Sequence, residues 1–515
     1  MRTALREARS SPSGTDRADA RRRSFKPRNR RSPYDESDSA SRCDQSRAAA
    51  TRVPLQAAGE SREVELAFTH REKRTPLSPS AADVALRFGL ADPESKTVIL
   101  PHAKVSLGPG RLILLTGPSG SGKSSALSQI ERQFPDACIV QRITLSPESA
   151  ILDGLASWLP CGQVAALLTA CGLGEPRLWI HPFDALSDGE KFRARLARAV
   201  ALRERTSRAA PILCDEFCSL LHRRVARAVS YSLRKLVTRR KLSVVVACSQ
   251  LDLIDDLQPD AVVRLSRGSH CEIEERVVRP EAPPAFRRRL RVERGSKRDY
   301  DAFAAMHYRA TDELGFVDKV FILRDPTDSA VLGIVVYSHG PLELSLRNQA
   351  TGGRFSRNPA RVNRDLRILR RLVLHPDIRG CGLGHYLVEK TLPRVGTNFV
   401  ECLAAMGEFN PVFEKAGMKR VGQYDVAPER KAVLESLRSM GVDPFARDFI
   451  LHVCRRRRVR ELVAGAVYDW YAATTAGGEK RVAHQSPDFL ARTFRGLIGA
   501  RPVYYLWKKP LRRAA

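Results

Sequence analysis

Apolar and polar positions divide the chain of 515 residues into stretches with different patterns. Residues 1–62 have almost no apolar periodicity and are rich in Arg, Ser, Asp and Ala, which predicts a disordered basic tail. Acidic residues near the N-terminus disfavour the alternative of an organelle transit peptide. In residues 63–282, apolar runs such as Leu112–Leu115 alternate with amphipathic stretches, which predicts buried parallel strands separated by helices. A proline-rich break at 280–284 indicates a linker.

The remainder of the chain carries a second α/β pattern. It begins with a predicted strand at Leu290–Val292, becomes mostly helical over 427–500, and closes with a predicted strand at Pro502–Trp507. We therefore expect an α/β protein with two folded domains, at residues 63–282 and 287–515. The helical stretch would be an insertion in the second domain, and the final strand would complete its sheet.

Charge points to a polyanionic partner. Lys and Arg number 87 against 57 Asp and Glu, giving a formal net charge of +30, and from residue 283 onward 42 basic residues stand against 24 acidic ones. Such a field attracts RNA, DNA or another anionic surface. The alternative is an Arg-rich composition whose charges are simply solvated.

Cysteine usage and hydropathy indicate the compartment. The 11 cysteines show no CxxC spacing, which argues against a zinc ribbon or a disulfide framework and favours a reducing, cytoplasmic location. No apolar stretch approaches the ~18 residues of a membrane helix. The sequence thus predicts a soluble protein without a membrane subunit.

A glycine-rich loop follows the apolar run Leu112–Leu115 and precedes an amphipathic helix. Its spacing is that of a P-loop, in which backbone N–H groups surround the phosphates, the lysine reaches the β- and γ-phosphates, and the following serine hydroxyl ligates Mg²⁺. The loop predicts ATP binding by Gly117, Ser119, Gly120, Ser121, Gly122, Lys123, Ser124 and Ser125.

A second apolar run, Ile212–Cys214, ends in two carboxylates. Asp215 is expected to hold Mg²⁺ through water, and Glu216 to polarise the water that attacks the γ-phosphate. The segment Leu186–Lys191, which reads Leu-Ser-Asp-Gly-Glu-Lys, precedes this strand and opens a basic helix.

In this order the P-loop, Gln141 after a strand, the Leu186–Lys191 segment and the Asp-Glu strand resemble the ABC-type ATPases over about residues 80–282. The resemblance implies that Gln141 also contacts Mg²⁺ and the nucleotide, and that Phe88 covers the adenine. It further implies an ATP-dependent head-to-tail homodimer. In that dimer Ser187 and Gly189 cap the γ-phosphate on the partner's P-loop.

Two departures from this family suggest slow turnover. Asp188 replaces the first glycine of the signature pair, and Cys248–Gln250 stand where a switch histidine is usual. A slow ATP-gated clamp fits these residues better than a pump. A transporter subunit is disfavoured because an unrelated domain follows, and a chromosome-type ATPase because no long coiled coil is inserted.

A second glycine loop, Arg379–Gly384, lies between the apolar strand Leu372–Leu374 and a helix. Such a loop lets the backbone and a helix N-terminus approach a pyrophosphate. A dinucleotide fold would place its loop early in a βαβ unit, and this one comes late.

With the stretch Asn410–Met418, this loop resembles the GNAT acetyltransferases over about residues 287–426. The resemblance implies an acetyl-CoA site made by Leu374, Arg379, Gly380, Gly382, Gly384 and Asn410.

The catalytic residues of such a site are harder to assign. Acetyl transfer to an amine requires a base and a donor for the leaving thiolate, but Phe413 stands where the family commonly has a tyrosine. Glu401, Glu408 and His375 are the candidate bases, although His375 fits a structural role at a strand end. Catalysis by proximity alone remains the alternative.

Three functions remain open at this point. The first is an ATP-dependent acetyltransferase acting on RNA, such as a tRNA, supported by the basic run Arg455–Arg460. The second is a protein N-acetyltransferase gated by ATP. The third is a DNA-associated ABC ATPase with a non-catalytic GNAT module.

Overall fold

The structure is a computed structural model. It describes residues 61–71, 78–89, 96–206, 210–266, 270–279, 281–307, 314–474, 482, 485–499 and 501–510. Residues Ala57–Ala515 form one compact unit, which contains both predicted domains. The predicted basic tail lies outside the described residues except for Ser61 and Arg62, and Arg62 already begins a strand.

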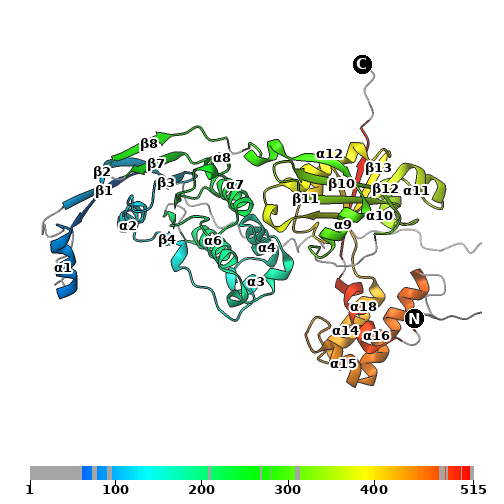
Figure 1. The fold of residues 1–515 in the computed structure, drawn as a ribbon. Coiled ribbons are helices and arrows are strands. Elements are labelled where there is room, and N and C mark those ends of the chain that lie inside the picture. Colours follow the sequence, from blue (N-terminus) through cyan, green and yellow to red (C-terminus); the bar gives the residue numbers. More distant parts are fainter. Residues whose placement is uncertain are drawn as a thin grey trace, which may run out of the picture. The chain divides into compact units, whose positions relative to one another are not determined.

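The first sheet has six strands in the order β4-β5-β6-β3-β7-β8 (Figure 1). The first five are parallel and β8 is antiparallel. Side chains of β3 alternate between two cores, because Leu112 and Leu114 face one cluster while Ile113 and Leu115 face the other. The strands are β3 (Leu112–Thr116), β4 (Cys138–Ile139), β5 (Ile212–Cys214), β6 (Val244–Ala247), β7 (Ala261–Ser266) and β8 (His270–Glu275).

Helices cover both faces of this sheet. Helix α2 and the antiparallel pair β1–β2 pack on one face, while α3, α4, α6 and α7 pack on the other. The elements of this region outside the sheet are β1 (Arg62–Arg71), α1 (Pro79–Arg87), β2 (Lys96–Leu107), α2 (Lys123–Gln133), α3 (Ile151–Leu155), α4 (Cys161–Ala170), α5 (Pro176–Trp179), α6 (Asp188–Arg205), α7 (Arg223–Arg240) and α8 (Ile254–Leu257).

The second sheet has seven strands in the order β14-β15-β13-β12-β11-β10-β9. Its neighbours are antiparallel except for β12 and β13, which run parallel. Pairing joins Leu366–Leu369 of β12 to Phe399–Cys402 of β13 and stops there. The strands are β9 (Arg291–Gly295), β10 (Val317–Asp325), β11 (Ala330–Ser338), β12 (Leu366–Leu374), β13 (Phe399–Ala404), β14 (Lys419–Gln423) and β15 (Val503–Lys508).

Helices α12 and α9 cover opposite faces of the second sheet (Figure 1). The predicted closing strand is β15, which lies between β13 and β14. The helices here are α9 (Lys297–Ala304), α10 (Ser345–Ala350), α11 (Pro359–Asp365), α12 (Leu383–Thr391) and α13 (Val412–Lys415).

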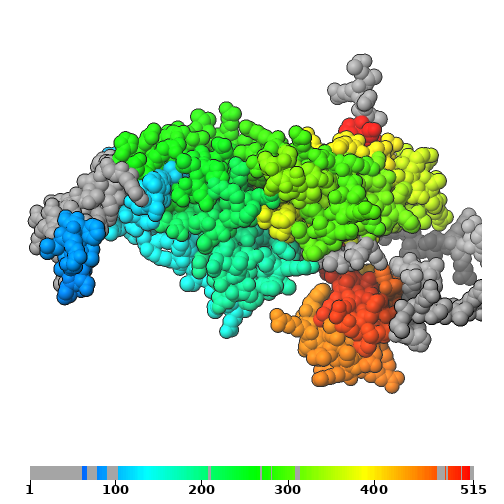
Figure 2. All heavy atoms as spheres, viewed as in Figure 1, coloured from blue at the N-terminus to red at the C-terminus, as the bar shows by residue number. Residues whose placement is uncertain are grey.

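A group of helices stands between β14 and β15 in the sequence and occupies the stretch predicted to be helical. It has its own apolar core, which includes Leu437, Phe449 and Phe494. Figure 2 shows this group in orange and red. Its helices are α14 (Pro428–Ser439), α15 (Phe449–Arg455), α16 (Arg457–Thr474) and α18 (Pro487–Gly499). Among the described residues, no helix is both long and apolar enough to cross a bilayer.

Candidate functional site

The first glycine loop joins the buried strand β3 to helix α2. Gly117, Gly120 and Gly122 have φ values of 149°, 77° and 92°. A Cβ on Gly117 would come within 2.0 Å of the Leu265 carbonyl oxygen, so glycine is required there. The loop therefore presents its backbone N–H groups at the N-terminus of an 11-residue helix, which favours a phosphate.

Side chains in this loop fit a bound nucleotide. Nζ of Lys123 donates to the carbonyl oxygens of Gly117 and Pro118, at 2.8 Å each, and so lies across the loop. Ser121 is 2% exposed, and its hydroxyl has no hydrogen-bond partner among the described residues. A buried hydroxyl without a partner is costly, and a phosphate oxygen would satisfy it.

The Asp-Glu strand reaches the loop because β5 is separated from β3 only by β6. The Ser124 hydroxyl donates to Oδ2 of Asp215 at 2.6 Å. The amide of Gln141 donates to the Asp215 carbonyl and accepts from its N–H at 3.4 Å. These oxygen ligands are the kind that Mg²⁺ prefers, so the three side chains predicted to hold the metal come together.

Glu216 follows directly, with φ at 44° and its side chain exposed. Its N–H donates to Oδ1 of Asp215 at 2.8 Å, which fixes the turn. This position beside the Ser124–Asp215 pair suits the predicted role in activating water. The residues Cys248–Gln250 stand where the ABC-type ATPases usually have a switch histidine. Among them, Cys248 is buried, and Gln250 accepts a hydrogen bond from Arg223.

The signature segment begins the 18-residue helix α6. Ser187 is its N-cap, and Oε2 of Glu190 accepts from the Ser187 N–H at 2.9 Å and from its hydroxyl at 2.8 Å. Ser187 and Asp188 are exposed, while Gly189 is partly covered. Asp188 is compatible with a helix N-terminus, because a carboxylate there is favoured by the helix dipole.

Phe88 is 74% exposed at the end of helix α1. Its predicted position over adenine therefore stays a prediction.

The second glycine loop joins β12 to helix α12, with Gly380 and Gly382 both at φ 87°. The loop borders a cavity of about 510 Å³, where β12 and β13 diverge. The structure brings together every residue predicted for acetyl-CoA on the wall of this cavity, namely Leu374, Arg379, Gly380, Gly382, Gly384 and Asn410.

The Arg379 guanidinium does not extend into open space. It donates to the carbonyl oxygens of Leu374 at 3.0 Å and Met306 at 2.9 Å, and its Nη1 lies 3.9 Å from a carboxylate oxygen of Glu175. In this arrangement Arg379 holds the loop in shape through its backbone carbonyl contacts.

Glu401 differs from the prediction of a catalytic base. Its side chain is fully buried and bonded twice to the equally buried Arg347, at 2.9 and 2.7 Å. The Tyr504 hydroxyl donates to it at 2.9 Å. A carboxylate held by three donors cannot readily accept a substrate proton, so Glu401 stabilises the sheet. The alternating pattern of β13 could not reveal its buried partner.

The other two candidate bases also lie away from the cavity wall. Glu408 is exposed and accepts a hydrogen bond from Gln423 at 3.2 Å. His375 caps the short turn Pro376–Ile378, where its Nδ1 accepts from the Asp377 N–H at 3.4 Å. Burial lowers the pKa of His375. These contacts favour the structural role considered for His375.

Several residues of the cavity wall were not predicted from the sequence. Thr169, Glu175 and Arg239 belong to the first region, yet they line the same cavity as the second glycine loop. His385 and Lys415 also line it, and both lie in or beside the quoted motifs. Only the motif neighbours could have been suspected from sequence.

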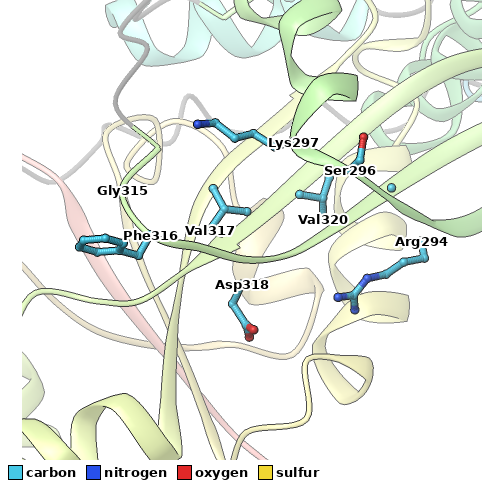
Figure 3. A pocket seen from close by; sticks show the side chains of 9 residues that line it. Arg294, Ser296, Lys297, Gly315, Phe316, Val317, Asp318 and Val320 are labelled. Carbon is cyan, nitrogen blue, oxygen red and sulfur yellow. The ribbon is translucent and has the colours of Figure 1, made fainter.

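Another hollow, of about 440 Å³, lies at the start of α9 (Figure 3). Figure 3 shows Val317 and Val320 between Phe316 and Arg294. Ser296 at its edge is already engaged by Asp299, at 2.6 Å from its N–H. None of the predicted site residues lines this hollow.

Comparison with known proteins agrees with the first site. No protein-family model matches the chain. The lipoprotein-releasing system ATP-binding protein LolD of Nitrobacter winogradskyi is 28% identical over 218 residues, covering 35% of this chain and 90% of that protein. The taurine import ATP-binding protein TauB of Pseudomonas putida is 31% identical over 140 residues, covering 21% of this chain and 52% of that protein.

Among solved structures, the dimeric bacterial ABC transporter cassette MJ0796 is similar, with 18% identity and a TM-score of 0.31, over 42% of this chain and 100% of that one. The ordered motifs, their geometry and the curated relatives agree. The chain therefore contains an ABC-type ATP-binding cassette, homologous to the ATP-binding proteins of ABC transporters.

Proposed function

We propose that the cassette hydrolyses ATP to control an acetyl-CoA-dependent N-acetyltransferase of the GNAT type in the same chain, and that the acceptor is an RNA. The observation that carries the proposal is the cavity between the diverging ends of β12 and β13, bordered by the Arg379–Gly384 loop. A splayed pair of parallel strands leaves room for the extended pantetheine arm that carries the acetyl group. The glycine loop supplies N–H groups for the pyrophosphate.

The reaction is acyl transfer to nitrogen. An amine attacks the thioester carbonyl, the C–S bond breaks, and the amine proton leaves as the thiolate of coenzyme A is protonated. Since neither Glu401 nor Glu408 lines the cavity, the protein's contribution is to hold the thioester and the amine together, with water carrying the proton. Proximity can supply a large part of the barrier reduction.

ATP hydrolysis requires a composite site in this proposal. Ser187 and Asp188 are exposed at the N-terminus of α6, where a second copy's nucleotide can reach them. With Mg²⁺ held between Ser124 and Asp215, ATP would join two copies head to tail. The curated relatives carry transporter names, so they lend no support to the prediction that the chain acts without a membrane subunit.

An RNA acceptor fits the charge of the helices between β14 and β15. Arg455 at the end of α15, Arg456 in the joint and Arg458 at the start of α16 are all exposed. Arginines grouped on one segment suit phosphate contacts, and binding through several phosphates weakens steeply with salt.

The test uses the full chain with radiolabelled acetyl-CoA, and total RNA or total protein as acceptor. Label in RNA supports the proposal, and label in protein alone replaces the RNA acceptor with a protein amine. Label in neither, with coenzyme A still bound, favours a non-catalytic acyl-CoA sensor on a DNA-associated ATPase. The observation behind that second candidate is that Phe413 and the buried Glu401 leave the cavity without the predicted acid and base.

A further inference from the structure

Helix α7 of the cassette is built into the core of the second sheet. Ala228 and Tyr231 on α7 are buried in the same apolar cluster as Ile378 and Cys381 of the second glycine loop. Residues three or four apart share one face of a helix. The packing of Ala228 and Tyr231 therefore also sets the direction of the residues that follow Tyr231 at intervals of four, Lys235 and Arg239.

These turns of α7 carry positive charge to the rim of the acyl-CoA cavity. Arg239, two turns beyond Tyr231, lines the cavity together with Lys415 and His385 of the second region. Lys235 lies between Tyr231 and Arg239 on α7, with its ammonium 4.3 Å from the centre of the Tyr231 ring. Within the described part of the chain, neither Arg239 nor Lys415 has a carboxylate partner in an ion pair.

The charge of Lys415 acts on two neighbouring groups, Lys235 and His385, and the charge of Arg239 acts on Lys235. Burial lowers the pKa of Lys235, and the charges of Arg239 and Lys415 lower it further against the opposing effect of Glu281. Burial likewise lowers the pKa of His385, with Lys415 and Lys235 adding to the effect. Several cations gathered at one cavity, where Glu175 is the carboxylate on the wall, favour a polyanionic ligand.

We propose that Arg239 of the ATP-binding cassette and Lys415 of the second region together bind phosphate groups of coenzyme A, so that the acyl-CoA site is complete only with a cassette residue. This inference rests on the proposed acyl-CoA site. Coenzyme A carries a pyrophosphate, which suits the glycine loop, and a 3′-phosphate on its ribose, which requires cations near the mouth of the cavity.

The experiment measures coenzyme A binding to the full chain by isothermal titration calorimetry. Arg239→Ala and Lys415→Ala are each compared with Arg438→Ala, which removes one exposed positive charge from helix α14. A charged hydrogen bond to phosphate corresponds to a loss of about tenfold to hundredfold in affinity, expected for the first two variants and not for the third. ATP binding to all three variants shows that the cassette is folded.

The comparison of coenzyme A with 3′-dephospho-coenzyme A then locates the contact. Weaker binding of the dephospho form to the wild type, with a smaller penalty for Arg239→Ala, supports a contact to the 3′-phosphate. Wild-type binding of coenzyme A with no loss in Arg239→Ala would overturn this inference and leave the proposed function standing. No wild-type binding of coenzyme A at all would overturn the proposed function itself.

Discussion

The two glycine loops of this protein differ in where their basic side chains point. In the P-loop, Lys123 spans the loop it belongs to, and Ser124 and Asp215 meet within the same region. In the second loop Arg379 is turned back onto backbone carbonyls, and the cavity beside it is also lined by Arg239 of the cassette and by Lys415. The charged side chain of the first loop therefore stays with its own loop, whereas the second loop lies beside charged side chains from other parts of the chain.

The largest expected effect concerns the buried ion pair between Glu401 and Arg347. Glu401→Ala leaves the Arg347 guanidinium buried without its carboxylate, so the free energy of unfolding should fall by about 3–5 kcal/mol. Chemical denaturation of the full chain checks this, with Glu408→Ala as the exposed control. A Glu401→Ala protein of unchanged stability that lost only acetyl transfer would restore Glu401 as a base.

The next effect concerns the lysine of the P-loop. Lys123→Ala should lower the rate of ATP hydrolysis by about 10²–10³, the cost of removing one charged donor from a phosphoryl-transfer site. Because the second site does not use Lys123, coenzyme A affinity should stay unchanged. A parallel loss of coenzyme A binding would contradict the separation of the two loops. ATPase rates and calorimetry on the same preparation check both statements.

A smaller effect is expected at the arginine of the second loop. Arg379 donates from two different nitrogen atoms to two backbone carbonyls. The single ammonium of a lysine cannot reach both carbonyls, so Arg379→Lys should lower the free energy of unfolding by about 1–3 kcal/mol. Thermal unfolding measures the change. If Arg379→Lys keeps full stability but loses coenzyme A binding, the side chain contacts the ligand directly.

The smallest effect is a pH dependence. The pKa of His385 is lowered by burial and by Lys415 and Lys235, with a contribution of Arg287 in the same direction and of Glu389 in the opposite one. A bound phosphate would raise that pKa, so binding takes up a proton. Coenzyme A affinity should then rise by less than about tenfold as the pH falls from about 7.5 to 6. Calorimetry of His385→Asn isolates this contribution, since the phosphates themselves titrate in the variant too.

Much of the candidate chemistry could be read from the sequence, because it depends on residues close together in the chain. The glycines at 117, 120 and 122 are required by local φ values and close approach, and an apolar strand followed by such a loop and a helix predicts their arrangement. The six residues that were predicted to bind acetyl-CoA also lie on the wall of one cavity. The role of Glu401 was missed, since its partner Arg347 lies 54 positions away.

Local sequence patterns were enough to predict two glycine loops, their flanking strands and helices, and the ATP-binding cassette. These follow from backbone geometry and apolar periodicity, which are local properties. The fold was needed to show that Glu401 is a buried counter-ion of Arg347, and that Arg239 lines the cavity of the other region. Both outcomes depend on long-range packing: the burial of Arg347 beneath the sheet, and the insertion of Ala228 and Tyr231 of α7 into the second core.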